Sequence, residues 1–242
     1  MRPTSQSARE AMESERGEPW FLAGWKDVLM MHFEVPPEIL QPLVPFELDT
    51  WAGKAFVSLV GFKLDRLRPR KAPALLLAPI ATHEFLNVRT YVKHRGETGI
   101  YFLAEWLPNW LSVAMGRPLF GLPYRLGVLE YDHANPSALT GRVTSKDLIS
   151  WTAKGEGKLQ SAEKGTLTEW LMERYTAFTY WLGIKRRFRV WHPPWPQIPV
   201  QAKVINEGLL DETGRWFEHA RFVGANWSPG FDDVWMGAPR FL

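Results

Sequence analysis

Apolar and polar side chains alternate along much of the chain, a pattern typical of β-strands. The clearest strand is predicted over residues 84–94, EFLNVRTYVKH. Its more polar face carries Phe85, Asn87, Arg89 and Tyr91, and the intervening positions are mostly apolar. The pattern alone leaves open which face points inward. An exposed sheet would turn the polar face to solvent, whereas a closed barrel would make that face the lining of a binding cavity.

Two longer segments follow a helical pattern. Asn109 is a good N-cap for a helix that ends near Pro118. A second helix is predicted over residues 166–181, because Thr166 and Glu169 form a capping-box pair ahead of apolar positions at helical spacing. Further strands or hairpins are predicted over residues 50–64, 99–108, 123–132, 139–163 and 186–205.

These elements predict one β-rich α+β domain over residues 20–242, since neither an internal repeat nor a linker divides them. Residues 1–19 are polar and short of large side chains, which favours a disordered or loosely helical lead-in. The composition, 45% hydrophobic and 23% charged, supplies ample material for a core.

Charge and cysteine content narrow the classes of function. The chain contains no cysteine, which excludes disulfides and thiolate chemistry. Its net charge of +3 is mild, and RLRPRK at 66–71 is the single dense basic run, so nucleic-acid binding is not expected. No apolar stretch is long enough to span a bilayer and the N-terminus lacks a signal-peptide pattern, so we expect a cytoplasmic protein without a membrane partner.

Familiar catalytic motifs are absent. There is no phosphate-binding glycine loop, dinucleotide fingerprint or nucleophile elbow, and the six histidines are scattered. We therefore predict neither a metal site nor a cofactor. His83 and Glu84, next to Asn87 and Arg89, suggest acid–base chemistry, but an ion pair between Glu84 and a nearby arginine is the simpler interpretation.

Five short motifs occur in order: HFEVPPEILQPLVP at 32–45, LNVRTYV at 86–92, GLPYR at 121–125, ERY at 173–175 and HPPWP at 192–196. Together they resemble the YqjF-like family of bacterial proteins, the DUF2071 group. That group is similar to the acetoacetate decarboxylase superfamily. The resemblance implies a closed, mostly antiparallel β-barrel with a few flanking helices, and oligomers in that superfamily make a homo-oligomer a further expectation.

The resemblance also implies where the chemistry has changed. Acetoacetate decarboxylases form a Schiff base through the first lysine of a Gly-Phe/Tyr-Pro-Lys-Lys motif, a position that GLPYR fills with Tyr124, followed by Arg125. A phenol cannot form an imine, and a guanidinium stays protonated. The superfamily's acidic residue, expected two positions before Asn87, is Phe85 here, and Glu84 lies one residue away on the opposite face of a regular strand. Decarboxylation by the family mechanism is therefore not expected.

Three functions remain open from the sequence. The first is a cavity that binds a small carboxylated or carbonyl metabolite through Arg125, Tyr124, Arg89, Asn87 and Tyr91. The second is a lyase, hydratase or isomerase acting on a small keto or hydroxy acid, with Tyr124 or Glu84 as catalytic candidates and Lys93 or Lys63 as a displaced amine. The third is a structural subunit whose barrel is filled by aromatic side chains. Alternation also predicts that Tyr124 and Arg125 do not face the same cavity, and Arg125 has Glu105 or Glu130 as alternative partners.

Overall fold

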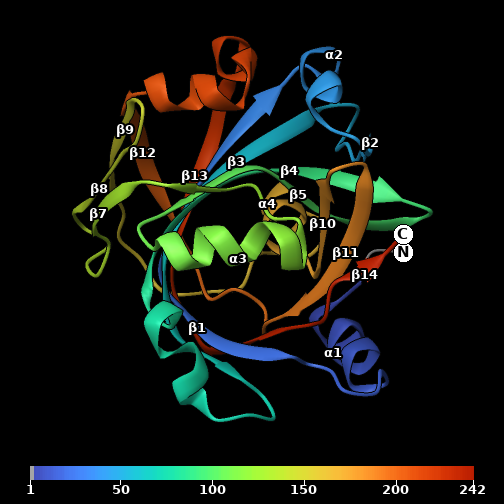
Figure 1. Ribbon diagram of the computed structural model, residues 1–242. Helices are drawn as coiled ribbons and strands as arrows, with labels where there is room; N and C mark the ends of the chain where they lie inside the picture. Colours follow the sequence, from blue (N-terminus) through green and yellow to red (C-terminus); the bar gives the residue numbers. More distant parts are fainter. Residues whose placement is uncertain (1–2) are drawn as a thin grey trace.

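The alternating segments pair into one fourteen-stranded, strongly curved sheet in the computed structural model, which describes residues 3–242 (Figure 1). The strands are β1 (Phe21–Val35), β2 (Glu47–Leu48), β3 (Ala55–Pro69), β4 (His83–His94), β5 (Glu97–Leu107), β6 (Tyr124–Leu126), β7 (Val128–Asp132), β8 (Leu139–Thr144), β9 (Leu148–Lys154), β10 (Thr176–Trp181), β11 (Ile184–Trp191), β12 (Ile198–Asn206), β13 (Arg221–Met236) and β14 (Arg240–Phe241). The helices are α1 (Ser5–Glu13), α2 (Pro37–Leu40), α3 (Trp110–Phe120) and α4 (Leu167–Met172), with 3-10 helices η1 (Gln41–Leu43), η2 (Ala74–Ile80), η3 (Gly208–Thr213) and η4 (Arg215–His219). The predicted β-rich α+β class is confirmed.

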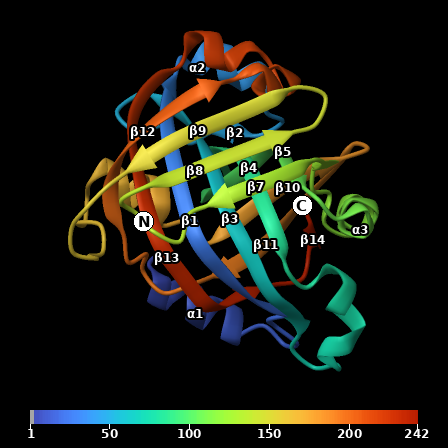
Figure 2. The same ribbon diagram turned by 90° about the vertical axis from the view of Figure 1, so that its left-hand side faces the viewer.

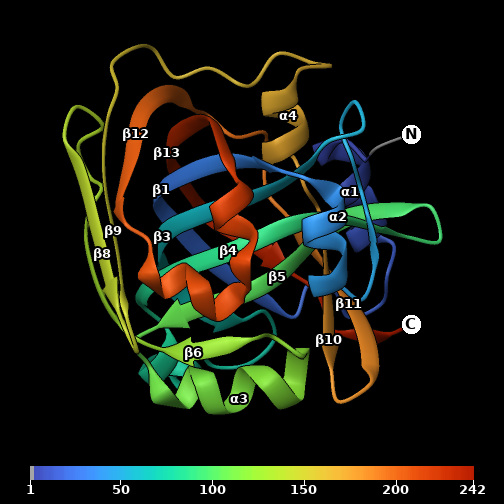
Figure 3. The same cartoon turned by 90° about the horizontal axis from the view of Figure 1, so that it is seen from above.

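The sheet follows the order β14-β11-β10-β5-β4-β3-β1-β13-β12-β9-β8-β7, with β2 and β6 attached to β4 and β5. Long antiparallel ladders join β13, β1, β3, β4 and β5 in its centre. Beyond β13 the sheet folds back, so that β7, β8 and β9 lie across the outside of β1 and β3 (Figure 2). Seen from above, α3 and α4 lie at opposite ends of the concave side (Figure 3).

The two faces of strand β4 border different parts of the molecule, the main apolar core on one side and the concave side of the sheet on the other. Its even-numbered side chains, Leu86, Val88 and Val92, are fully buried in the large apolar cluster that fills the space between the central strands and the layer of β7, β8, β9 and β12. Its odd-numbered side chains therefore point to the concave side of the sheet. This placement decides which face of the 84–94 strand is the cavity face: it is the polar one.

The predicted helix over residues 166–181 is only partly correct. The Thr166 hydroxyl caps α4 as expected, but the helix ends at Met172, and Thr176–Trp181 forms β10. This strand pairs with β11 along its whole length and with β5 at Ala177 and Phe178. β-Branched and aromatic residues suit such a ladder, so tertiary pairing overrides the helical spacing. No helix within residues 3–242 is long and apolar enough to cross a membrane.

The N-terminal segment, for which we expect a disordered or loosely helical lead-in, contains a helix. Residues 5–13 form a regular helix whose first turn is capped by Thr4. The helix packs on β11, where the Trp191 indole donates to the Ser5 carbonyl at 3.0 Å and the Arg9 guanidinium lies 5.1 Å from the centre of the Trp191 ring. Met12 is fully buried. The sequence signal was hidden because only two buried residues, Ala8 and Met12, anchor an otherwise polar helix.

Replacing Met12 with alanine tests this docking. Removing a fully buried methionine side chain is expected to lower the free energy of unfolding by about 2 kcal/mol. Chemical denaturation of Met12→Ala and of the exposed control Glu10→Ala provides the comparison. Equal stability of the two variants would show that the segment does not dock.

Candidate functional site

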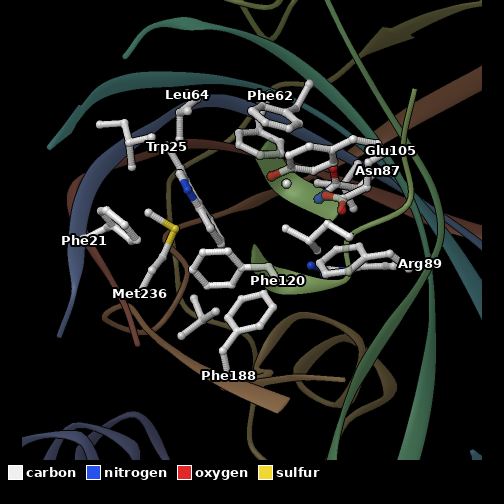
Figure 4. Close-up of a pocket in the computed structure, with 18 of the residues that line it drawn as sticks. Phe21, Trp25, Phe62, Leu64, Asn87, Arg89, Glu105, Phe120, Phe188 and Met236 are labelled. Atoms are coloured by element: carbon white, nitrogen blue, oxygen red, sulfur yellow. The ribbon is translucent and has the colours of Figure 1, made fainter. Parts of the chain in front are cut away.

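A cavity of about 180 Å³ lies on the concave side of the sheet, between the central strands, α3 and η2. Most of its wall is apolar, and its aromatic side chains include Phe21, Trp25, Phe62, Phe85, Phe102, Phe120, Phe188 and Trp195. Three of its polar side chains lie together. Figure 4 shows Asn87, Arg89 and Glu105 together on one side, with Phe21 and Met236 on the opposite side. The predicted cavity therefore exists, and Asn87 and Arg89 line it.

Arg89 is the distinctive group in this wall. The residue is only 6% exposed, and its Nε has no hydrogen-bond partner. Its Nη2 contacts the sulfur of Met30 at 3.7 Å, and within residues 3–242 it forms no ion pair with a carboxylate. By contrast, the other buried arginine of the wall, Arg174, is paired with Asp49 at 2.7 Å. The cavity therefore contains one guanidinium whose charge the described part of the protein does not balance.

The histidines near Arg89 do not add charge to the site. Burial, reinforced by the Arg89 charge, lowers the pKa of His32 to about 3. Burial likewise lowers the pKa of His192 to about 4, although a hydrogen bond to the Pro193 carbonyl opposes that shift. Both imidazoles are therefore neutral near pH 7.

Glu105 is the site residue that sequence reasoning missed. It is paired with Asn87 across the β4–β5 ladder, its Oε2 lacks a hydrogen-bond partner, and burial raises the pKa of its carboxyl well above the usual range. Simple alternation from Phe102 would turn Glu105 to the outer face. The register shifts between Val88 and Arg89, where β5 carries an extra residue, and this β-bulge moves Glu105 to the cavity face. Nothing in the local sequence identifies this bulge.

Tyr91 shares the concave face but is not a cavity-lining residue. Its hydroxyl donates to the Leu171 carbonyl at 3.0 Å and lies 2.6 Å from the Ser58 hydroxyl. Because the Tyr91 proton is used, Ser58 must donate to Tyr91 and accept a hydrogen bond from His32 Nδ1 at 2.7 Å. The expectation that Tyr91 binds the ligand is therefore corrected. Tyr91 instead belongs to a buried hydrogen-bond chain on the face of the sheet that carries Arg89.

The GLPYR segment divides its two candidate side chains between different faces. Gly121, at φ 73°, ends α3, and the Tyr124 ring then packs beneath Gly116 and lines the cavity. Arg125 points away: its Nη1 pairs with Glu212 at 2.6 Å, and it lies 5.3 Å from the centre of the Trp106 ring. The expectation that Arg125 binds the ligand is therefore corrected, and its partner is Glu212 rather than Glu105 or Glu130.

The remaining catalytic candidates are not in the cavity. Glu84 lies at an even-numbered position of β4, on the side away from the cavity, as the one-residue shift predicts. Lys63 is exposed, and Lys93 pairs with Glu47 at 2.7 Å, which raises the pKa of its ammonium and opposes imine chemistry. Among the described residues, the cavity wall includes no lysine.

Comparison with known proteins identifies the family. A family model for DUF2071, described as an uncharacterised conserved protein, matches residues 22–230. The chain belongs to the DUF2071 family. It is 32% identical over 195 residues to the uncharacterised protein YqjF of Bacillus subtilis (strain 168), covering 78% of this chain and 80% of that protein.

Solved structures with the same fold are distant in sequence. An acetoacetate decarboxylase-like enzyme from Sphingomonas wittichii RW1 superposes with a TM-score of 0.65 at 15% identity, covering 93% of both chains. The enduracididine biosynthesis enzyme MppR complexed with pyruvate superposes with a TM-score of 0.63 at 13% identity, covering 94% of this DUF2071 chain and 91% of that enzyme. At these identities the comparisons establish a shared fold, that of acetoacetate decarboxylase-like proteins.

Gly116 provides a test of how α3 positions Tyr124. A Cβ at this position would lie 2.3 Å from the Tyr124 ring. In an unobstructed helix interior, Gly→Ala is expected to stabilise by about 1 kcal/mol. Here overpacking is expected to dominate, so Gly116→Ala should lower the free energy of unfolding by about 1–2 kcal/mol. A higher free energy of unfolding for Gly116→Ala than for the wild type, measured by chemical denaturation, would contradict this packing.

Glu105→Gln tests the buried acid. Because folding raises the pKa of Glu105, the native state holds a proton that the unfolded chain loses as pH rises, so the carboxyl destabilises the fold increasingly above its usual pKa. The variant should therefore gain stability over the wild type as pH rises above the usual carboxyl pKa, by at most about 1.4 kcal/mol per pH unit. Melting temperatures of both proteins between about pH 5 and pH 9 measure the difference. Parallel pH profiles would mean that Glu105 is not held protonated.

Proposed function

We propose that this DUF2071 protein binds a small carboxylated or carbonyl-containing metabolite in the cavity, and that Arg89 holds its carboxylate. The observation that carries this proposal is the buried Arg89 guanidinium, which lines the cavity without an ion-pair partner among the described residues. A charge removed from water is costly unless another charge or several hydrogen bonds compensate it. A ligand carboxylate would supply that compensation, and a guanidinium can hold both of its oxygens in parallel.

Two other polar groups of the wall suit a carboxylate. Neutral Glu105 can donate a hydrogen bond through its hydroxyl, and Asn87 can donate through its Nδ2 amide. Neutral His32 and His192 leave Arg89 as the source of positive potential at this side of the wall. An ionised Glu105 would repel the ligand, so its raised pKa favours binding.

Two further observations support a ligand cavity. Strand β11 pairs with β13 as well as with β10, so the ladders connect in a ring through β5, β4, β3 and β1. We infer that this ring behaves as the closed barrel implied by the family resemblance. MppR, which shares the fold, has been solved with the keto acid pyruvate. An open cavity also disfavours the alternative of a barrel filled by aromatic side chains.

A second candidate function is acid–base catalysis on a small keto or hydroxy acid. It is favoured by two acids of the cavity wall, Glu105 and Tyr124, because burial raises the pKa of each well above its usual range. Turnover would appear as exchange of the C3 protons of pyruvate for deuterium in deuterium oxide, which proton NMR can monitor. Exchange that requires Glu105 would support catalysis, whereas exchange no faster with protein than without it would leave binding alone.

Replacing Arg89 tests the binding proposal. Arg89→Met should abolish detectable binding of pyruvate and butyrate in calorimetric titrations, whereas Arg125→Met, altered outside the cavity, should bind as the wild type does. Arg89→Met is also expected to raise the melting temperature of the unliganded protein, because it removes a buried charge that has no carboxylate partner. Arg89→Lys keeps the charge without the planar fork and should bind weakly.

Retention of carboxylate binding by Arg89→Met, or equal losses in the Arg89 and Arg125 variants, would overturn the proposal. A more stable Arg89→Met protein that no longer binds would separate loss of the site from loss of the fold.

A further inference from the structure

The cavity is polarised from end to end. Its arginine, amide and carboxyl side chains, Arg89, Arg174, Asn87 and Glu105, are each less than one-tenth exposed. The lining residues that reach solvent are mostly apolar: Phe21 and Met236 are half-buried, and Leu119 is 49% exposed. The deep side of the cavity is therefore polar, and its solvent side is apolar. Figure 4 shows the same separation between Arg89 and the pair Phe21 and Met236.

The solvent side also carries unpartnered apolar surface. The 3-10 helix η2 lies beside α3, where the Asn109 side chain donates to the Pro79 carbonyl at 2.6 Å. Leu77 of η2 and Leu119 of α3 both line the cavity, and the adjacent Leu75 and Leu76 are 82% and 68% exposed. A small hydrophilic acid would gain nothing from such surroundings, because apolar walls contribute only through the apolar area they bury.

We propose that the ligand is an amphiphilic monocarboxylate, with its carboxylate at Arg89 and an aliphatic or aryl body extending along the aromatic wall toward the opening between η2 and α3. This inference rests on the proposed carboxylate site and adds the class and direction of the ligand. The head enters first, and the tail lies against Phe62, Phe120 and Met236. Tails that outgrow the cavity meet the exposed leucines of η2 rather than a closed end.

Chain length is the variable that tests this orientation. Calorimetric titrations with butyrate, hexanoate and octanoate measure the affinity for each acid. We expect the affinity to rise by about threefold for each added methylene, or roughly a hundredfold from butyrate to octanoate. Octanamide, which has the same tail and no charge, is expected to bind at least tenfold more weakly than octanoate. 3-Phenylpropionate extends the series to an aryl body and should bind more tightly than butyrate.

A polar substitution at the apolar end provides the matched test. Met236→Gln should lower the affinity for octanoate about tenfold and leave the affinity for butyrate unchanged, because only the longer tail reaches this position. Leu126→Gln, an exposed apolar position outside the cavity, should change neither affinity. A melting curve of each variant confirms that it is folded before titration.

The outcomes separate this inference from the proposed function. Arg89-dependent binding of pyruvate and butyrate with no gain for octanoate would overturn the amphiphilic ligand and leave the carboxylate site intact. Octanamide binding as tightly as octanoate, or no binding by any acid in the series, would overturn both. An equal loss of butyrate and octanoate affinity in Met236→Gln would contradict the proposed direction of the tail.

Discussion

The buried charge of Arg89 is the constraint on which this account depends. A guanidinium cannot shed its proton at accessible pH, so a protein that buries one must balance it or accept a loss of stability. Arg174 in the same wall is balanced by Asp49, whereas Arg89 forms no ion pair within the described chain. The carboxyl of the same wall, Glu105, is kept neutral by its own burial. The wall is thus left with a positive centre that an anionic ligand would complete.

The rest of the structure keeps that centre in place. The even-numbered face of β4 is held in the large apolar cluster beneath β7, β8, β9 and β12, which fixes the opposite face toward the cavity. Beside Arg89, the chain of hydrogen bonds from His32 through Ser58 and Tyr91 to the Leu171 carbonyl satisfies polar groups that would otherwise be orphaned. Rigid support of this kind lets a binding site retain a charge that weakens the unliganded fold.

Local pattern was sufficient to predict much of this architecture. Strict alternation in residues 84–94 indicated the amphipathic strand, and the choice between its faces followed once the second layer of strands was known. Alternation also correctly predicted that Tyr124 and Arg125 face different sides. The quoted motifs identified the family, which the match over residues 22–230 confirms.

The parts that could not be predicted depend on long-range pairing. The bulge in β5 that places Glu105 opposite Asn87 depends on the register between β4 and β5. Residues 176–181 form strand β10 and not the predicted helix, because they pair with β5 and β11. Arg125 forms its ion pair with Glu212, which is 87 residues away in sequence, so neither of the two partners predicted from the sequence, Glu105 and Glu130, was correct. Met12 is buried only because β11 presents a surface to α1.

A crystal structure of the protein with octanoate bound would decide whether Arg89 holds the ligand carboxylate. We expect both carboxylate oxygens within about 3 Å of the Arg89 guanidinium, with the alkyl chain along the aromatic wall toward Met236. A carboxylate bound at the opening, or at any site away from Arg89, would contradict that expectation.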